Sequence, residues 1–339
     1  MEVVIGLEDL ARQEIEALPG HVDIADTAAS GSIHFTYGGS LSDLLRLRLA
    51  VAAYLVRAYP IARPLALLGH QNFHQLLADI RDVLALHPPA AFRSLRISAA
   101  GETSSVYERL RRELGTAAGL SPVLGEGDLS LHIRRSADRS DGFEVAIRVS
   151  PRPLSARPWR VCDMPGALNA SVARAVVRLM QPSSGDCFVN LACGSGTLLV
   201  ERLENGPVAR AIGVDSSAEA LRCASRNLAA AGLEGRAELV QGDAGAVTLP
   251  DASVSAVCAD LPWGQLVGTH EVNEGLYPRV IREAARVAVP GAPMVLLSAQ
   301  VRLMERTLRE HSSQWKLERE LRLRTGTVNV RAYVLSRRG

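Results

Sequence analysis

The feature that most constrains the fold is a regular alternation of apolar runs and amphipathic stretches after residue 165. The apolar runs predict strands at 187–191, 211–214, 237–241, 254–260 and 294–298. Helical periodicity predicts helices at 169–180, 197–203, 217–231 and 277–288. This alternation favours a parallel, doubly wound, Rossmann-like α/β sheet. A helix at 301–311 and two late strands, near 316–323 and 328–335, complete an expected sheet of seven strands, the last inserted antiparallel.

The N-terminal part has a less regular, mixed α+β pattern. Strands are expected near 3–5, 32–37, 92–99, 129–134 and 142–149, with a turn at 136–142. Helices are expected at 7–18, 41–56, 72–86 and 105–118. Three prolines between Ser150 and Pro158, without hydrophobic periodicity, predict a linker. We therefore expect an N-terminal region at 1–150, a linker at 151–164 and a second domain at 165–339.

Charge is distributed unevenly although the net charge is only +2. Residues 44–160 contain seventeen arginines and ten acidic residues, a surplus of seven positive charges. A basic segment of this kind is a candidate nucleic-acid surface, although solvated arginines of an ordinary surface give the same composition. The candidate phosphate contacts are Arg93, Arg96, Arg109, Arg111, Arg112, Arg134 and Arg135.

The five cysteines, at 162, 187, 193, 223 and 258, show no CxxC spacing. This pattern predicts neither a disulfide framework nor a zinc site, and we expect no metal cofactor and a cytoplasmic location. No run of 18 apolar residues and no secretory leader pattern is present, so no membrane association is expected.

A glycine-containing loop follows the first predicted strand of the second domain, in Asn190-Leu-Ala-Cys-Gly-Ser-Gly-Thr197. Glycines allow the backbone to turn sharply and to approach a ligand closely. The spacing is G-x-G, which suits a dinucleotide pyrophosphate less well than G-x-G-x-x-G. The candidate cofactor-binding residues of this loop are Asn190, Ala192, Cys193, Gly194, Ser195, Gly196 and Thr197.

Two carboxylates follow the next two strands at the same expected edge of the sheet. Asp215, with Ser216 beside it, stands where a carboxylate accepts both ribose hydroxyls of a nucleoside. Asp243, followed by Ala244, stands where an adenine amine is held. Asp215 alone is also compatible with a helix cap. Together with the glycine loop, the two carboxylates predict a site for S-adenosylmethionine (SAM).

The tetrapeptide Asp260-Leu-Pro-Trp263 ends the fourth predicted strand, at the edge where parallel sheets bind ligands. The Asp260 carboxylate and the Leu261 carbonyl are two acceptors that align an exocyclic NH2 group toward a methyl donor. Pro262 stiffens the turn, and Trp263 offers a flat face on which a base stacks. The alternative for an isolated strand is a simple turn with a packed Trp. Asp260 also serves as a proton acceptor, and a paired base must be flipped out to reach the site.

These motifs resemble those of the THUMP-domain tRNA guanine-N2 methyltransferases, the TrmN-like group of the RlmKL-type methyltransferase family. The glycine loop is similar to their Asp-x-x-Cys-Gly-Ser-Gly-Thr loop, with Asn190 in place of Asp. Arg157-Pro-Trp-Arg160, Pro165-Gly-Ala-Leu-Asn-Ala-Ser171 and Asn273-Glu-Gly-Leu-Tyr-Pro278 resemble further segments of the family. Leu261 replaces the first proline of the usual Asn/Asp-Pro-Pro-aromatic motif, as in the animal THUMP-domain-protein-3 subgroup.

The resemblance implies a class I methyltransferase domain preceded by a ferredoxin-like and THUMP RNA-binding region. It implies SAM as cofactor and a tRNA guanosine as substrate, with Trp159 and Arg160 as contacts to RNA or to the cofactor. For Asn169, a helix cap is an equally good interpretation. Adenine-N6 or rRNA guanine-N2 methylation, and an RNA-binding protein with an inactive methyltransferase domain, remain alternatives. The sequence gives no indication of a partner subunit.

Overall fold

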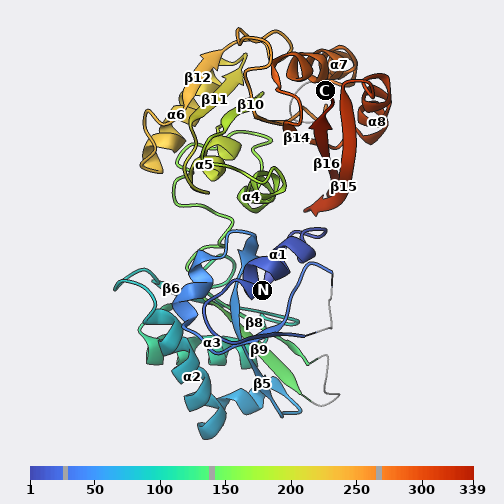
Figure 1. The fold of residues 1–339 in the computed structure, drawn as a ribbon. Coiled ribbons are helices and arrows are strands. Elements are labelled where there is room, and N and C mark those ends of the chain that lie inside the picture. Colours follow the sequence, from blue (N-terminus) through green and yellow to red (C-terminus); the bar gives the residue numbers. More distant parts are fainter. Residues whose placement is uncertain (26–29, 137–141, 265–268) are drawn as a thin grey trace. The chain divides into compact units, whose positions relative to one another are not determined.

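A computed structural model of the protein describes residues 1–25, 30–136, 142–264 and 269–339. The chain forms two compact units that meet in the sequence between Leu154 and Ser155, and Val4–Ala11 belongs to the second. The two units are built on different sheets (Figure 1). Within the described residues, no helix combines the length and the apolar character needed to cross a membrane.

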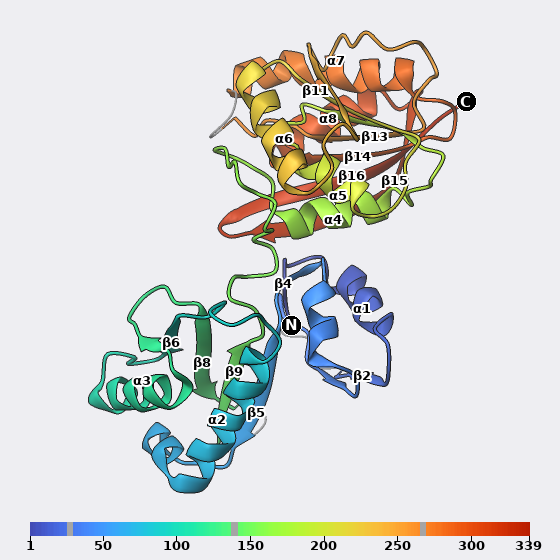
Figure 2. The same cartoon turned by 90° about the vertical axis from the view of Figure 1, so that its left-hand side faces the viewer.

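The first unit contains the N-terminal strands and two long helices. Its strands are β1 (Glu2–Val3), β2 (Val22–Ile24), β3 (Phe35–Tyr37), β4 (Ala50–Ala52), β5 (Tyr54–Tyr59), β6 (Ser94–Ala99), β7 (Ser121–Pro122), β8 (Leu129–Arg135) and β9 (Phe143–Arg148). Five of them form a mixed sheet in the order β5-β9-β8-β6-β7. Helices α2 (His70–Leu84) and α3 (Ser105–Ala118) pack against each other and against this sheet (Figure 2). Helix α1 (Glu8–Glu16) spans the boundary between the two units.

One predicted element of this unit is wrong. The expected helix at 41–56 is a short 3-10 segment, Leu41–Arg46, followed by the strands β4 and β5. Tyr54 to Tyr59 of β5 pair in antiparallel register with Arg148 to Phe143 of β9. The aromatic and β-branched residues of this stretch suit a pleated strand, and pairing with a distant strand decides between the two patterns. The predicted turn at 136–142 lies mostly outside the described residues.

The second unit confirms the expected seven-stranded sheet. Its strands are β10 (Cys187–Leu191), β11 (Arg210–Asp215), β12 (Glu238–Gln241), β13 (Ala256–Asp260), β14 (Pro293–Ser298), β15 (Trp315–Thr325) and β16 (Val328–Arg337). Their order is β12-β11-β10-β13-β14-β16-β15, and β16 lies antiparallel to both of its neighbours. The helices are α4 (Ala170–Leu179), α5 (Thr197–Leu203), α6 (Ala218–Ala230), α7 (His270–Val287) and α8 (Val301–Glu310).

Helices cover both faces of this sheet. Helix α5 packs against α4 and α6 on one face, whereas α7 and α8 pack together on the other (Figures 1 and 2). The strand order reverses between β10 and β13, so their carboxyl ends border the crevice at which open α/β sheets bind ligands. Gly196 allows α5 and α6 to approach closely there, because a Cβ on it would lie 2.9 Å from the Cβ of Ala224.

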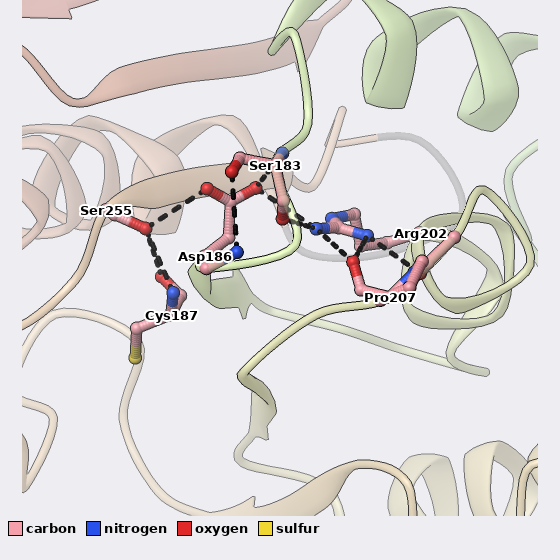
Figure 3. A network of polar contacts seen from close by, with 8 residues as sticks. Ser183, Asp186, Cys187, Arg202, Pro207 and Ser255 are labelled. Atoms are coloured by element: carbon pink, nitrogen blue, oxygen red, sulfur yellow. Dashed lines mark hydrogen bonds and ion pairs between the residues drawn. The ribbon is translucent and has the colours of Figure 1, made fainter.

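A closed polar network lies at the opposite, amino edge of the same sheet (Figure 3). The buried guanidinium of Arg202 donates to the carbonyls of Ser183 and Pro207, at 2.6 and 3.2 Å. It also pairs with the Asp186 carboxylate at 3.1 Å, and the second oxygen of that carboxylate accepts the Ser255 hydroxyl at 3.4 Å. The network joins α5, the turn before β10 and the segment before β13, and protein groups satisfy most of its polar atoms.

Candidate active site

The glycine loop turns back on itself directly after β10. Ala192, Gly194 and Gly196 all have positive φ, at 52°, 53° and 79°. Left-handed backbone is inexpensive for the two glycines, whereas Ala192 is held there at a cost in strain. The N–H of Gly194 donates to Asp215 Oδ2 at 2.8 Å, which ties the loop to the end of β11.

Asp215 is fixed from two sides. Besides the bond from Gly194, its Oδ1 accepts the N–H of Ser217 at 2.9 Å. Ser217 is itself the cap of α6, since its side chain accepts the N–H of Ala220. Asp215 therefore orients the start of the helix and still has unused carboxylate lone pairs, so both interpretations of this residue are compatible with the geometry.

A cavity of about 460 Å³ opens at the carboxyl edge of the sheet. It is lined by predicted cofactor residues, namely Ala192, Cys193, Gly194, Ser195, Thr197, Asp215, Ser216, Asp243 and Ala244. The four residues of the catalytic tetrapeptide also line it. Gly196 and Asn190 are not among the lining residues. Asn190 is fully buried and donates weakly to the carbonyls of Leu191 and Cys258, at 3.3 and 3.4 Å.

Further residues complete the lining of this cavity. They are Met164, Pro165, Gly166, Ala167, Leu168, Leu198, Ser217, Ala220, Leu276 and Val328. Those at 164–168 precede α4, in the Pro-Gly-Ala-Leu segment that carries part of the family resemblance. Leu198 and Ser217 directly follow predicted cofactor residues. The remaining three, Ala220, Leu276 and Val328, come from α6, α7 and β16, whose positions relative to the loop depend on the tertiary fold, so spacing along the chain could not indicate them.

Asp243 is already engaged by the protein. Its Oδ1 accepts the N–H of Gly245 at 2.8 Å, and its Oδ2 pairs with Arg279 of α7. A ligand amine at this corner of the cavity therefore meets an ion pair rather than a lone carboxylate. Arg279 is a residue that sequence reasoning missed, because it lies 36 positions further along the chain.

The predicted catalytic tetrapeptide, Asp260-Leu-Pro-Trp263, leaves the sheet at the end of β13. Burial raises the pKa of the Asp260 carboxyl from 3.8 to about 7, and a hydrogen bond from Trp263 partly opposes this rise. Trp263 Nε1 donates to Asp260 Oδ1 at 3.2 Å, which brings the indole beside the carboxylate. Among the described residues, no donor contacts the carbonyl of Leu261. The N–H of Leu261 donates to the carbonyl of Leu297 at 3.1 Å. Asp260 and Leu261 both line the cavity, so the carboxylate of one and the carbonyl of the other are the acceptors that this turn can offer.

The segment 160–162, before α4, is bonded both to the end of the glycine loop and to α6. Arg160 donates to the carbonyl of Leu168 at 2.6 Å and to the Thr197 hydroxyl at 3.0 Å. Cys162 and Cys223 form a disulfide, with a Cα–Cα distance of 5.4 Å. The expectation that no disulfide forms is therefore wrong. The two cysteines are 61 positions apart, and only the packing of this segment on α6 brings them together.

Asn227 of α6 uses its whole side chain in the same place. Its Oδ1 accepts the N–H groups of Val161 and Cys162, and its Nδ2 donates to the carbonyls of Cys162 and Ser195. Trp159 beside this segment is 3% exposed, so it presents no face for stacking. Asn169 caps α4 by accepting the N–H of Ser171 at 2.9 Å, as the capping interpretation expected.

The predicted phosphate contacts in the first unit differ in their surroundings. Arg93 and Arg112 are exposed, and Arg96 is half-buried. Arg111 is 5% exposed, so this side chain is not offered at the surface. The others already have protein partners: Arg109 pairs with Glu113, Arg134 pairs with Glu144, and Arg135 lies over the Phe143 ring. In the part of the chain that the structure describes, no cluster of His, Cys, Asp and Glu is placed to hold a metal ion.

Comparison with known proteins places these features in context. Residues 157–330 match the family model described as RMKL-like, methyltransferase domain. A mouse protein named U6 snRNA (guanine-N(2))-methyltransferase THUMPD2 is 30% identical over 162 residues, which is 48% of this chain and 29% of that protein. Mouse tRNA (guanine(6)-N(2))-methyltransferase THUMP3 is 25% identical over 185 residues, 51% of this chain and 37% of that protein. The chain thus matches only about a third of the length of these relatives.

The solved structures include one that is similar over the whole chain. The crystal structure of TrmN from Thermus thermophilus matches with a TM-score of 0.74 and 25% identity, and covers 99% of this chain and 98% of that one. A methyltransferase crystallised with SAH, SMU.472, shares the fold at a TM-score of 0.67 and 14% identity, over 98% of this chain and 96% of that one.

Proposed function

The chain belongs to the RMKL-like methyltransferase family, and we propose that it uses SAM to methylate the exocyclic N2 amine of a guanosine in tRNA. The observation that carries this proposal is that Asp260 and Leu261 are adjacent lining residues of the cavity, and that no donor among the described residues contacts the Leu261 carbonyl. An exocyclic amine has two N–H donors, and two adjacent acceptors match it. The half-buried indole of Trp263 offers the base a surface on which to stack.

The residues at the carboxyl edge fit SAM. Asp215 would hold the ribose, the backbone of the glycine loop would approach the methionine part, and the Asp243–Arg279 pair would border the adenine. When bound, SAM supplies an electrophilic methyl group on a sulfonium. A sulfonium bound in this cavity would favour the ionised form of Asp260, whose carboxyl pKa burial raises in the protein without ligand.

The protein's contribution to the reaction is alignment and charge stabilisation. Asp260 and the Leu261 carbonyl would accept hydrogen bonds from the two amine N–H groups, which directs the nitrogen lone pair toward the methyl group. The ionised Asp260 then stabilises the positive charge that develops on the nitrogen and accepts one proton, directly or through water. A target base inside a helix has to be flipped out to reach these acceptors.

The basic part of the first unit is proposed to bind the RNA. The exposed arginines Arg93 and Arg112 have no acidic side chain paired with them among the described ion pairs, which favours them as phosphate contacts. Residues 1–150 would form this RNA-binding region, 151–164 the connection and 165–339 the methyltransferase domain. We propose tRNA as substrate, in line with a relative named as a tRNA methyltransferase. The cytoplasmic location stays a proposal from the cysteine pattern, and the Cys162–Cys223 disulfide weighs against that ground.

The test is incubation of the full chain with radiolabelled SAM and, separately, total tRNA, U6 snRNA and rRNA, followed by digestion to nucleosides. Labelled N2-methylguanosine from tRNA supports the proposal. The same nucleoside from U6 snRNA or rRNA alone would overturn the choice of RNA, and N6-methyladenosine would overturn the choice of base. Tight tRNA binding without any methylated product would assign the chain to the RNA-binding alternative.

A further inference from the structure

Two side chains of α7 converge on one backbone carbonyl of the catalytic turn. Asn273 Nδ2 donates to the carbonyl of Pro262 at 2.7 Å, and the Tyr277 hydroxyl donates to the same oxygen at 2.8 Å. The two residues are four positions apart and therefore share a face of the helix. Both are fully buried. They belong to the Asn-Glu-Gly-Leu-Tyr segment, to which the reaction described above assigns no role.

The direction of the hydrogen bonds at Tyr277 follows from its partners. The Pro262 carbonyl only accepts, so the tyrosine proton points to it. The Ser298 hydroxyl, 2.8 Å away, then donates to Tyr277, and it accepts the N–H of Gln300 at 2.9 Å. This gives a directed chain of bonds from Gln300 through Ser298 and Tyr277 to Pro262. Such chains are stiffer than isolated bonds because each member polarises the next.

The carbonyls of Leu261, Pro262 and Trp263 therefore differ in the hydrogen bonds that they accept from the protein. Pro262 has two donors, and Trp263 receives the side-chain amide of Gln300 at 3.1 Å. No donor among the described residues contacts the carbonyl of Leu261. We infer that Asn273 and Tyr277 are positioning residues, which fix the turn so that the Leu261 carbonyl is the one presented to the substrate amine. The inference rests on the proposed amine methylation.

The environment of Asn273 argues against a role in packing alone. Its Oδ1 is buried without a hydrogen-bond partner, so half of the amide is desolvated and gains nothing in return. An apolar residue of the same shape would avoid this cost. A polar side chain kept at such a position is explained by the bond that its other half makes, which is the bond to Pro262.

The test compares Tyr277→Phe, Asn273→Leu and the double variant with the wild type and with Tyr333→Phe. Tyr333 lies in the same hydrophobic core as Tyr277, but its hydroxyl makes no hydrogen bond to the catalytic turn among the described residues, so the control removes the same atom without removing such a bond. We expect kcat to fall about 10-fold for each single variant and about 100-fold for the double variant, as for a small misplacement of reacting groups. In all variants, SAM affinity and KM for RNA should stay within about threefold of the wild type. In the Tyr333→Phe control, kcat should also stay within about threefold of the wild type.

A substrate-independent readout is the quenching of tryptophan fluorescence by acrylamide. Of the three tryptophans, Trp159 and Trp315 are 3% and 2% exposed, so accessible emission comes from Trp263. Quenching should increase in Tyr277→Phe and in the double variant but not in Tyr333→Phe. Unchanged kcat in the double variant, or a loss of SAM affinity as large as the loss of kcat, overturns the inference.

Failure of the proposed function gives a different result. If the wild type methylates another amine, kcat on that amine still decides whether the turn is positioned by α7. If the wild type methylates nothing, the quenching experiment decides: equal quenching in all variants overturns the positioning role, and a selective increase supports it.

Discussion

The two edges of the seven-stranded sheet are both rich in polar groups but use them in opposite ways. At the amino edge, the guanidinium of Arg202 is bonded to carbonyls and to Asp186, and it is sealed from water. At the carboxyl edge, Asp215, Asp260 and the Leu261 carbonyl border a cavity of about 460 Å³ and keep acceptor capacity in reserve. At the amino edge the polar groups mostly bond to one another, whereas at the carboxyl edge they border a cavity that a ligand can enter.

The largest effect, on the rate of methyl transfer, is expected when the Asp260 carboxylate is removed from the carboxyl edge. Asp260→Ala should reduce methyl transfer at least about 1000-fold, because alignment of the amine and stabilisation of its developing charge are both lost. SAM affinity, measured by calorimetry, should stay within about threefold. Turnover that survives this change would show that the amine is aligned by other groups.

The next effect, on stability, is expected when the Arg202–Asp186 ion pair of the amino edge is broken. Arg202→Met should lower the free energy of unfolding by about 3 kcal/mol, since it leaves the carboxylate of Asp186 without its partner. SAM affinity of the folded fraction should not change. The control is Arg210→Met, which breaks the exposed pair with Glu238 and should cost less than about 0.5 kcal/mol. Equal costs in chemical denaturation would remove the contrast between the two edges.

A smaller effect, on SAM affinity, is expected for a residue of the carboxyl edge that is proposed to bind the cofactor and not to act on the substrate amine. Asp215→Ala should weaken SAM binding about 30-fold, which is about 2 kcal/mol, because two charge-assisted bonds to ribose are lost. Glu219→Ala, which removes an exposed carboxylate of the same helix region, should leave SAM binding unchanged. Calorimetric affinity that is equal for the two variants would contradict the ribose role of Asp215.

The smallest effect concerns the stability cost of an active-site carboxylate. The folded pKa of Asp260, about 7, lies above its ordinary value of 3.8, so stability is lost as pH rises between these values. Asp260→Asn should therefore raise the free energy of unfolding by about 1–2 kcal/mol at pH near 5 and leave it unchanged at pH near 3, where the carboxyl is protonated in both states. Denaturation curves at the two pH values measure this difference, and an equal change at both would show that another interaction is responsible.

Sequence patterns predicted the active edge well because its residues follow strand ends. Asp215 and Asp260 end β11 and β13, and parallel topology brings such positions together without further information. A sheet of seven strands with an antiparallel last strand was also predicted, whereas the order of the strands comes from the structure. The periodicity of the sequence therefore predicts the strands and the strand-end residues around which the site is built.

Partners that come from distant segments were not predicted. The Cys162–Cys223 disulfide, the Asp243–Arg279 pair and the bonds of Tyr277 to the catalytic turn all join residues at least 15 positions apart. The expected helix at 41–56 failed for the same reason, since pairing of β5 with β9 depends on residues almost a hundred positions away. Tertiary contacts of this kind override local preference.

The most direct test of the account is the pH dependence of kcat/KM with SAM and tRNA both far below saturation, where the rate reports the free enzyme. The rate is expected to rise with pH through a single ionisation near pH 7, because Asp260 accepts hydrogen bonds from the amine and takes up its one released proton only when ionised. A profile that is flat from about pH 6 to about pH 8, or one that falls as pH rises, would contradict it.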